Sequence, residues 1–241
     1  SNSVVSTISV GYSPLGVAIT PNGQYVYVTN SIGTVSVIST STNSVVTTIP
    51  LPISGYATEI AITPNGKYVY VGDNGGGLDV ISTATNSVIA NIPPSEVFPW
   101  GVAVSPNGQF VYVADAGGEF NDNVSVISTA TNQVVARIPI VVGDYSKNLA
   151  VTPNGKYIYV TGQSNLVGVI STSNFQVIKV INISPSTGSE GVTVTPNGQY
   201  VYVANFGSNT VSVISTSNNQ VVTTISGTPS EPCGISYGPL G

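Results

Sequence analysis

The tripeptide Pro-Asn-Gly recurs along the 241-residue chain and sets the period of the whole sequence. Its copies begin at Pro21, Pro64, Pro106, Pro153 and Pro196, so successive copies lie 42–47 residues apart. A period of this length is typical of β-propellers, in which each repeat contributes one blade. The chain is therefore best interpreted as a repeat protein before any individual strand is assigned.

Four short segments recur within each period. In the first period they are 16–21, 24–30, 34–40 and 44–50. Each is rich in β-branched or aromatic residues and bounded by Gly, Pro, Asn or Ser, which is typical of a strand. Pro-Asn-Gly predicts a tight turn after the first strand, and a Ser/Thr/Asn cluster predicts another after the third. Four antiparallel strands form a blade whose two apolar faces must be covered by neighbours, so we predict an all-β propeller.

The ends of the chain hold one spare strand each. Five complete repeats occupy 10–226 of a single domain, 1–241, while 1–9 matches a fourth strand and 227–241 matches a first strand. The residues expected in these spare strands are Ser3, Val4, Val5 and Ile8, and Gly234, Ile235 and Tyr237. Three arrangements are open: a five-bladed ring with extra strands at its seam, a half-built sixth blade, or strands that pair with another subunit.

The second strand of each repeat carries a family resemblance. Its sequence is YVYVTN at 25–30, YIYVT at 157–161 and YVYVAN at 200–205, each following Pro-Asn-Gly. These segments closely resemble the YVTN β-propeller repeat, a family that includes archaeal surface-layer proteins and bacterial YncE-like secreted proteins. The resemblance implies a propeller fold and an extracellular or cell-surface location. It does not imply one function, because propellers support many.

Composition excludes several classes of function. Only 6% of residues are charged, and the chain has no histidine, no methionine and one cysteine. Without histidine, Ser-His-Asp catalysis and His-ligated zinc are excluded. A net charge of −5 gives nucleic acid little to bind, and the longest apolar runs, 110–114 and 200–204, are too short to span a bilayer. The first residue is Ser1, so we expect a signal peptide to have been removed.

The acidic residues are expected to gather on one face of the propeller. Nine of the ten carboxylates fall in or beside loops that follow the second and fourth strands: Glu59, Asp73, Glu96, Asp115, Glu119, Asp122, Asp144, Glu190 and Glu231. Only Asp79 falls within a third strand. Either these groups are simply solvated, or they attract a cation or a cationic partner.

One acidic loop is a weak candidate for calcium, the only cofactor that the sequence suggests. Asp115, Glu119 and Asp122 lie within eight residues that include two glycines. Oxygen-rich loops can wrap Ca²⁺, which takes six to eight oxygen ligands. The spacing is not that of an EF-hand, and an ordinary solvated turn would have the same composition.

Loop aromatics beside carboxylates are candidates for binding. Trp100, between Pro99 and Gly101, is the foremost, and the others are Tyr56, Phe98 and Tyr145, with Glu59 and Glu190 as polar neighbours. Exposed aromatic rings suit sugar stacking or a protein interface. Alternatively, these rings pin their own loops to the blades.

The sequence therefore favours a non-catalytic structural or binding propeller at a cell surface. One version is a subunit of a surface layer or filament that self-associates through its terminal strands. The alternatives are a secreted propeller that binds glycans or other proteins, and a lactonase-like hydrolase. A hydrolase would need converging His, Asp, Glu or Arg at the channel, whereas glycine stands at 16, 101 and 191, where first strands begin.

Overall fold

The fold is given by a computed structural model of the chain. It describes residues 3–53, 55–95, 97–116, 123–143, 146–183 and 188–228, together with 232 and 234. Within these residues the regular structure is almost entirely strand, with a single 3₁₀ turn, η2 (Phe206–Ser208). The described part of the chain contains no helix that is long and apolar enough to cross a membrane.

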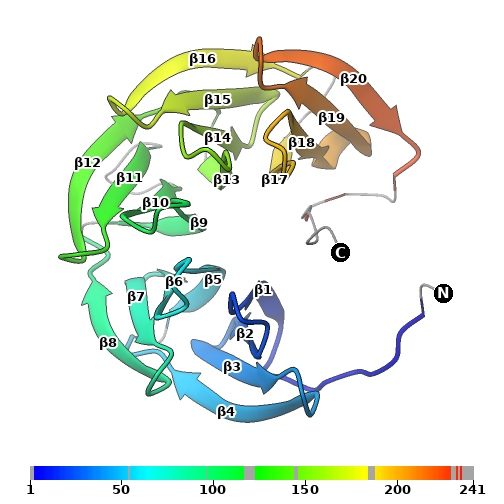
Figure 1. Cartoon of the computed structure of the whole chain (residues 1–241). Helices are drawn as coiled ribbons and strands as arrows, with labels where there is room; N and C mark the ends of the chain where they lie inside the picture. The colour runs from blue at the N-terminus through cyan, green and yellow to red at the C-terminus, as the bar shows by residue number, and fades with distance from the viewer. Residues whose placement is uncertain are drawn as a thin grey trace. The chain divides into compact units, whose positions relative to one another are not determined.

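Twenty strands form five separate four-stranded antiparallel sheets, consistent with a five-bladed β-propeller of repeats (Figure 1). Blade 1 consists of β1 (Pro14–Ile19), β2 (Tyr25–Asn30), β3 (Thr34–Ser39) and β4 (Ser44–Pro50). Blade 2 consists of β5 (Tyr56–Ile62), β6 (Tyr68–Asn74), β7 (Gly77–Ser82) and β8 (Ser87–Ile92). In every sheet the strands are hydrogen-bonded in sequence order, as the repeat predicts.

The remaining three blades repeat this pattern. Blade 3 consists of β9 (Pro99–Val104), β10 (Phe110–Asp115), β11 (Asn123–Ser128) and β12 (Gln133–Pro139). Blade 4 consists of β13 (Ser146–Val151), β14 (Tyr157–Gly162), β15 (Leu166–Ser171) and β16 (Gln176–Asn182). Blade 5 consists of β17 (Ser189–Val194), β18 (Tyr200–Asn205), β19 (Thr210–Ser215) and β20 (Gln220–Ser226). The chain divides into two compact units, 1–102 and 103–241, and the boundary falls within β9.

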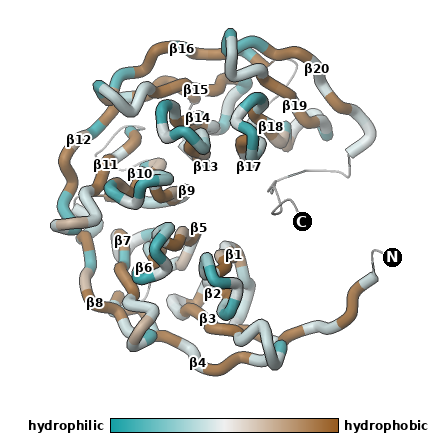
Figure 2. The backbone as a smooth tube through the Cα atoms, viewed as in Figure 1, coloured by the Kyte–Doolittle hydropathy of each residue, from teal (hydrophilic) through white to brown (hydrophobic). Residues whose placement is uncertain are grey.

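The Pro-Asn-Gly turns form because each residue type meets a local demand. Thr20 Oγ1 donates to Asn22 Oδ1 at 2.7 Å, and the backbone N–H of Gln24 donates to the same Asn22 oxygen at 3.1 Å. Gly23 adopts a φ of 70°, a left-handed conformation that costs glycine little. The same threonine or serine hydroxyl contact to asparagine recurs in all five blades. Figure 2 shows the resulting alternation of apolar strands and polar turns.

Adjacent blades pack through two kinds of face. In the first unit, a forward face of blade 1, formed by Tyr27, Val35, Val37 and Ile49, packs on a receiving face of blade 2, formed by Ile60, Val69, Val71 and Ile81. In the second unit, the forward faces of blades 3 and 4 pack in the same way on the receiving faces of blades 4 and 5. The central tyrosines of three second strands, Tyr27, Tyr112 and Tyr159, therefore pack between blades.

Hydrogen bonds join the forward face to the next blade between blades 1 and 2 and between blades 4 and 5. The Tyr27 hydroxyl donates to Asn86 Oδ1 at 2.6 Å, and Tyr159 donates to Asn219 in the same way. The acceptor asparagines lie in left-handed turn positions, with φ near 50°. Thr29 Oγ1 also donates to a backbone carbonyl of the next blade, that of Thr58, at 2.7 Å. Apolar packing thus recurs at each of the three described interfaces, and the tyrosine–asparagine hydrogen bond recurs between blades 1 and 2 and between blades 4 and 5.

The N-terminal spare strand does not form in the isolated chain. Residues 3–10 contain no strand, and Val4 and Val5 are 86% and 93% exposed. A fourth strand pairs with the third strand of its own blade, and β3 is already paired with β4. Gly234 is exposed and lies in no strand, whereas Ile235 and Tyr237 lie outside the described residues. The expectation of an added strand is therefore wrong at the N-terminal end of the chain alone, and at the C-terminal end it falls mostly outside the described residues.

Candidate functional site

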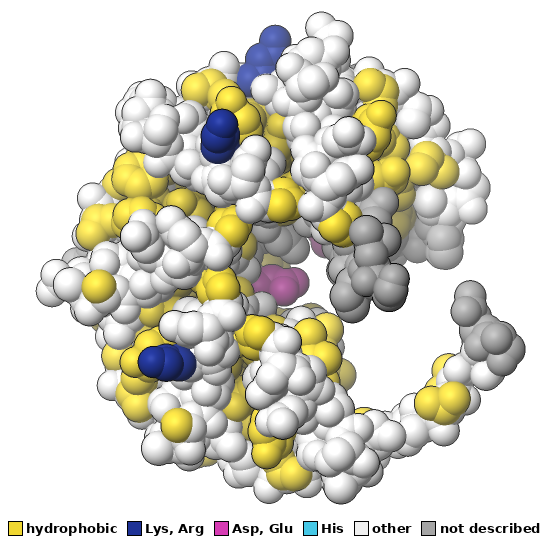
Figure 3. Space-filling model, in the orientation of Figure 1, with side chains coloured by type: hydrophobic (Ala, Val, Ile, Leu, Met, Phe, Trp, Pro, Cys, Tyr) yellow, Lys and Arg dark blue, Asp and Glu magenta, His cyan; other side chains and the backbone are white. Residues whose placement is uncertain are grey.

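The expected acidic face is wrong for two of the nine carboxylates assigned to it. Asp73 and Asp115 are the last or nearly last residues of β6 and β10, and they are 0% and 1% exposed. Asp79, in β7, is also 0% exposed. The side chain at the end of a second strand turns into the blade, where it meets the third strand, and the sequence pattern did not distinguish this position from a loop. Figure 3 shows that charged side chains are sparse on the visible face.

The calcium candidate loses its first ligand to an internal contact. Asp115 Oδ2 accepts a hydrogen bond of 2.5 Å from Ser125 Oγ on the neighbouring strand, so it has a structural partner. Glu119 and Asp122 lie outside the described residues. Among the residues that the structure does describe, no three potential metal ligands lie together.

The described aromatic candidates lie in or just before the first strands of their blades. Tyr56 begins β5 and is 44% exposed, whereas Phe98 and Trp100 are half-buried. Trp100 lies inside β9 rather than in the loop before it. Tyr145 lies outside the described residues. Each described ring thus belongs to the start of a first strand or its approach, which favours pinning of the local backbone.

The two glutamates expected near the binding face differ in environment. Glu59 is half-buried, and burial raises the pKa of its carboxyl while the backbone N–H of Ile60 opposes the rise. Glu190 lines a pocket of about 270 Å³ together with Gln163, Gly188, Ser189 and Phe206. Sequence reasoning did not single out Gln163 here, because its strand-end position carries no motif.

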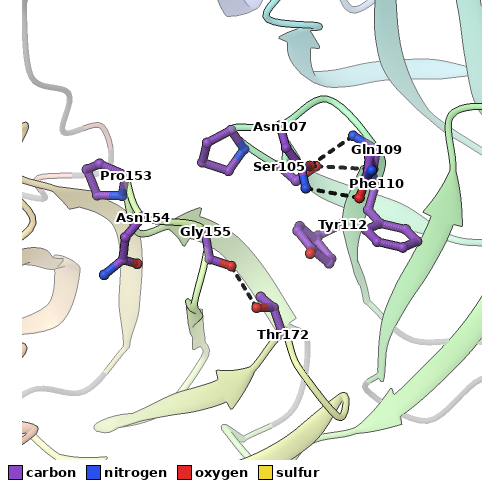
Figure 4. A pocket seen from close by; sticks show the side chains of 10 residues that line it. Ser105, Asn107, Gln109, Phe110, Tyr112, Pro153, Asn154, Gly155 and Thr172 are labelled. Atoms are coloured by element: carbon purple, nitrogen blue, oxygen red, sulfur yellow. Dashed lines mark hydrogen bonds between the residues drawn. The ribbon is translucent and has the colours of Figure 1, made fainter.

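The larger hollows lie between successive Pro-Asn-Gly turns. One of 320 Å³ lies between the turns at 105–109 and 153–155 (Figure 4). Its polar groups already bond to one another: Ser105 Oγ donates to Asn107 Oδ1, and Thr172 Oγ1 donates to Gly155 O. A similar hollow in the first unit lies between the turns at 20–25 and 65–66. Neither is lined by a charged side chain, so both are better explained as repeated packing gaps.

The receiving face of blade 1 is left uncovered. Val17 in β1 is 67% exposed, whereas its equivalents Ile60, Val102, Leu149 and Val192 are 4–7% exposed. Leu15 and Ile19 on the same strand are 51% and 58% exposed. We call Leu15, Val17 and Ile19 the first-blade face. It is apolar because the repeat builds a receiving face into every blade, including the one that has no preceding blade in the chain.

The forward face of blade 5 is also exposed. Ile225 in β20 is 44% exposed, whereas Ile49, Ile92, Ile138 and Ile181 are 2–5% exposed. Tyr202 and Val211 are half-buried, although Tyr27 and Val35, their equivalents in blade 1, are almost fully buried. We call Tyr202, Val211 and Ile225 the last-blade face. The repeat count was the signal that could have located both faces, since the first and last complete repeats each adjoin only one other complete repeat in the sequence.

Comparison with known proteins supports the fold. Residues 54–83 match the LVIVD repeat. The chain is similar to a structure titled Kuenenia stuttgartiensis hydrazine synthase, with a TM-score of 0.76 and 21% sequence identity over 91% of this chain and 68% of that one. In all, 1757 chains of known structure are similar, so the fold alone selects no function. A search of curated protein sequences finds no match.

Proposed function

We propose that this chain is a non-catalytic, extracellular propeller of the YVTN type that assembles with further copies of itself, head to tail. The observation that carries the proposal is the pair of uncovered apolar faces at the two ends of the repeat. The last-blade face of one copy covers the first-blade face of the next. Such a contact is heterologous, so it builds a larger ring where it closes and a filament where it does not.

The chemistry of the two faces supports this pairing. Inside the chain, Tyr27, Val35 and Ile49 pack on Ile60, Val69 and Val71. The last-blade face carries the same Tyr, Val and Ile set, and the first-blade face, with Val26 and Val28 beside it, carries the matching aliphatic set. A second copy therefore finds an interface that this chain already uses internally. Fully burying one Val or Ile side chain contributes about 1.5–3 kcal/mol.

The exposed N-terminal segment offers a second contact to the same neighbour. Residues 3–8, SVVSTI, match SVVTTI at 44–49, the sequence of β4. The segment has the composition of a fourth strand, but it lies unpaired beyond the sheet β1–β4 (Figure 1). Pairing with a strand edge of another copy would satisfy its backbone groups and cover Val4 and Val5. Terminal strand exchange would then reinforce the contact between faces.

A non-catalytic role is favoured by what surrounds the carboxylates. The buried ones have structural positions within strands. The chain supplies no histidine, and the other described candidates are aromatic side chains rather than acids or bases.

The assembly can be tested with one charge at each face. Sedimentation velocity and electron microscopy on the full chain should show rings of several copies or filaments. Val17→Asp blocks the first-blade face, and Ile225→Asp blocks the last-blade face, so each variant alone should be monomeric. Mixed together they should form only dimers, because each supplies the face that the other lacks.

Two controls separate the faces from general effects. Val46→Asp places the same charge at an exposed valine of β4, 51% exposed, and should leave assembly unchanged. Deletion of 1–9 should weaken assembly where strand exchange contributes. A wild-type chain that stays monomeric at every concentration, or a mixture of the two variants that stays monomeric, would contradict the proposal.

The pocket around Glu190 favours a second candidate, a glycan-binding propeller. An aromatic ring, a carboxylate and an amide around one hollow are the groups that stack on and hydrogen-bond a sugar. Binding to an array of glycans should then fall on Phe206→Ala, and Trp100→Ala tests the aromatic that the sequence favoured. Unchanged binding in both variants would exclude this site.

A further inference from the structure

Blade 2 holds two aspartates that water does not reach. Asp73 in β6 and Asp79 in β7 are both 0% exposed. The strand register pairs Asp73 with Gly77 and Val71 with Asp79. Because side chains two residues apart lie on the same side of a strand, the two carboxyl groups are diagonal neighbours on one face of the sheet.

Most of their oxygen atoms lack a hydrogen-bond donor. Asn91 Nδ2 donates to Asp79 Oδ1 at 2.8 Å, but Asp79 Oδ2 and both oxygens of Asp73 are buried without a hydrogen-bond partner. The nearby N–H of Gly55 donates instead to the Ile53 carbonyl at 2.8 Å. A Cβ on Gly55 or Gly76 would lie 1.8 Å or 2.2 Å from an Asp73 oxygen, so the carboxyl is enclosed between two glycines.

Equivalent positions in other blades pair a donor with an acceptor. In blade 1, Asn30 Nδ2 donates to Ser36 Oγ at 3.0 Å, and in blade 5, Asn205 Nδ2 donates to Ser212 Oγ at 2.8 Å. Blade 2 replaces both members of this neutral pair with carboxyl groups. Two ionised carboxylates would offer only acceptors to one another, and a buried unpaired acceptor is costly.

No basic side chain on the described elements of this sheet compensates the charge. The titratable residues on the elements packed around the pair are Tyr25 and Tyr27 on β2, Tyr56 and Glu59 on β5, and Tyr68 and Tyr70 on β6. Lys67 precedes β6 at the opposite end of the strand, six residues from Asp73, or about 20 Å away. The positive charge that would balance two ionised carboxylates must therefore come from solution, as a proton or a metal ion.

We propose that Asp73 and Asp79 form a proton-sharing carboxyl pair that retains one proton in mildly acidic solution. The proton is taken from solvent when the blade folds. The protonated group then points its O–H at an oxygen of its ionised neighbour, which restores the donor-to-acceptor pattern of the other blades. Blade 2 is thereby strengthened by acid.

The pKa values of both aspartates are raised, as proton sharing requires. Burial raises the pKa of Asp73 to about 6, with a further contribution from the Asp79 charge, while the nearby N–H of Gly55 opposes the rise. Burial also raises the pKa of Asp79, against the hydrogen bond from Asn91. The folded state therefore binds more protons than the unfolded state. The stability that the bound proton contributes is fully present below pH 3.8, the pKa of an aspartate in the unfolded chain. It is lost as the pH rises through about 6, the pKa of Asp73 in the folded state.

The test is urea unfolding from pH 3.5 to 8 of the full chain and of the double variant Asp73→Asn, Asp79→Ser, which copies the pair of blade 1. The wild-type folding equilibrium constant should fall by roughly 100-fold across this range, the equivalent of about two pKa units. The double variant should lose this decrease. With Glu59→Gln in both backgrounds, an infrared carbonyl band of a protonated carboxyl should be present at pH 5 when Asp73 and Asp79 are kept and much weaker when both are replaced.

Two single variants test the pair separately. Asp79→Asn imitates the protonated pair and should be at least as stable as the wild type at pH 7. Glu59→Gln removes another carboxyl of raised pKa and should keep the wild-type decrease in stability between pH 3.5 and 8. Equal pH dependence in the wild type and the double variant would overturn the proposal. It would also be overturned if Ca²⁺ raised, and a chelator lowered, the wild-type unfolding midpoint at constant pH without affecting the double variant.

Discussion

β16 and β20 are the same outer strand in two successive blades, yet their surroundings differ completely. Ile181 in β16 is 5% exposed because blade 5 follows it, whereas Ile225 in β20 is 44% exposed. The residue type, the strand and the position in the repeat are identical. The comparison shows that the repeat gives every blade the same apolar face. This face becomes part of a buried core only where another blade packs against it.

The largest predicted difference lies in the two isoleucines themselves. Ile181→Ala opens a cavity in a packed interface, so it should lower the free energy of unfolding by about 2–5 kcal/mol. Ile225→Ala, measured in dilute monomer, should cost less than about 1 kcal/mol because water already reaches the side chain. Chemical denaturation of both variants gives the values. Equal losses would mean that β20 is covered within a single chain.

The second comparison concerns the tyrosines that fasten the blades. Tyr159→Phe removes the hydroxyl that donates to Asn219 and should cost about 0.5–1.5 kcal/mol. Tyr202→Phe should cost less in the monomer, since Tyr202 is half-buried and water compensates for a lost contact. Assembly should enlarge the effect of Tyr202→Phe, which unfolding at high and low protein concentration would reveal. An effect that is independent of concentration would place Tyr202 outside the contact between copies.

A further lesson comes from the same position in different blades. Asn30 and Asp73 both end a second strand, and both turn into the blade, yet one forms a neutral hydrogen bond and the other faces a second carboxyl. The sequence pattern assigned Asp73 and Asp115 to solvated loops because carboxylates are usually exposed. Pairing with the third strand overrides that tendency, because the hairpin register places each side chain inside the blade, beside Asp79 or Ser125.

The candidate site was less predictable than the fold for a related reason. Trp100 was expected in a loop because Pro99 and Gly101 flank it, but the first strand of blade 3 begins at Pro99. Proline is tolerated there because this strand forms one edge of its sheet. The two uncovered faces, in contrast, contain no unusual residue at all. Their sequence equals that of buried positions, so residue type could not distinguish them.

The sequence by itself determined the period, the four strands of each blade and the two kinds of turn. These features depend on contacts within about 50 residues and on residue types with strong local preferences. Only the tertiary structure decided which identical faces are covered, that residues 3–10 remain unpaired, and that Asp73 and Asp79 are buried together. Burial depends on what packs against a side chain, and identical repeat sequences do not show which blades have another blade packed against them.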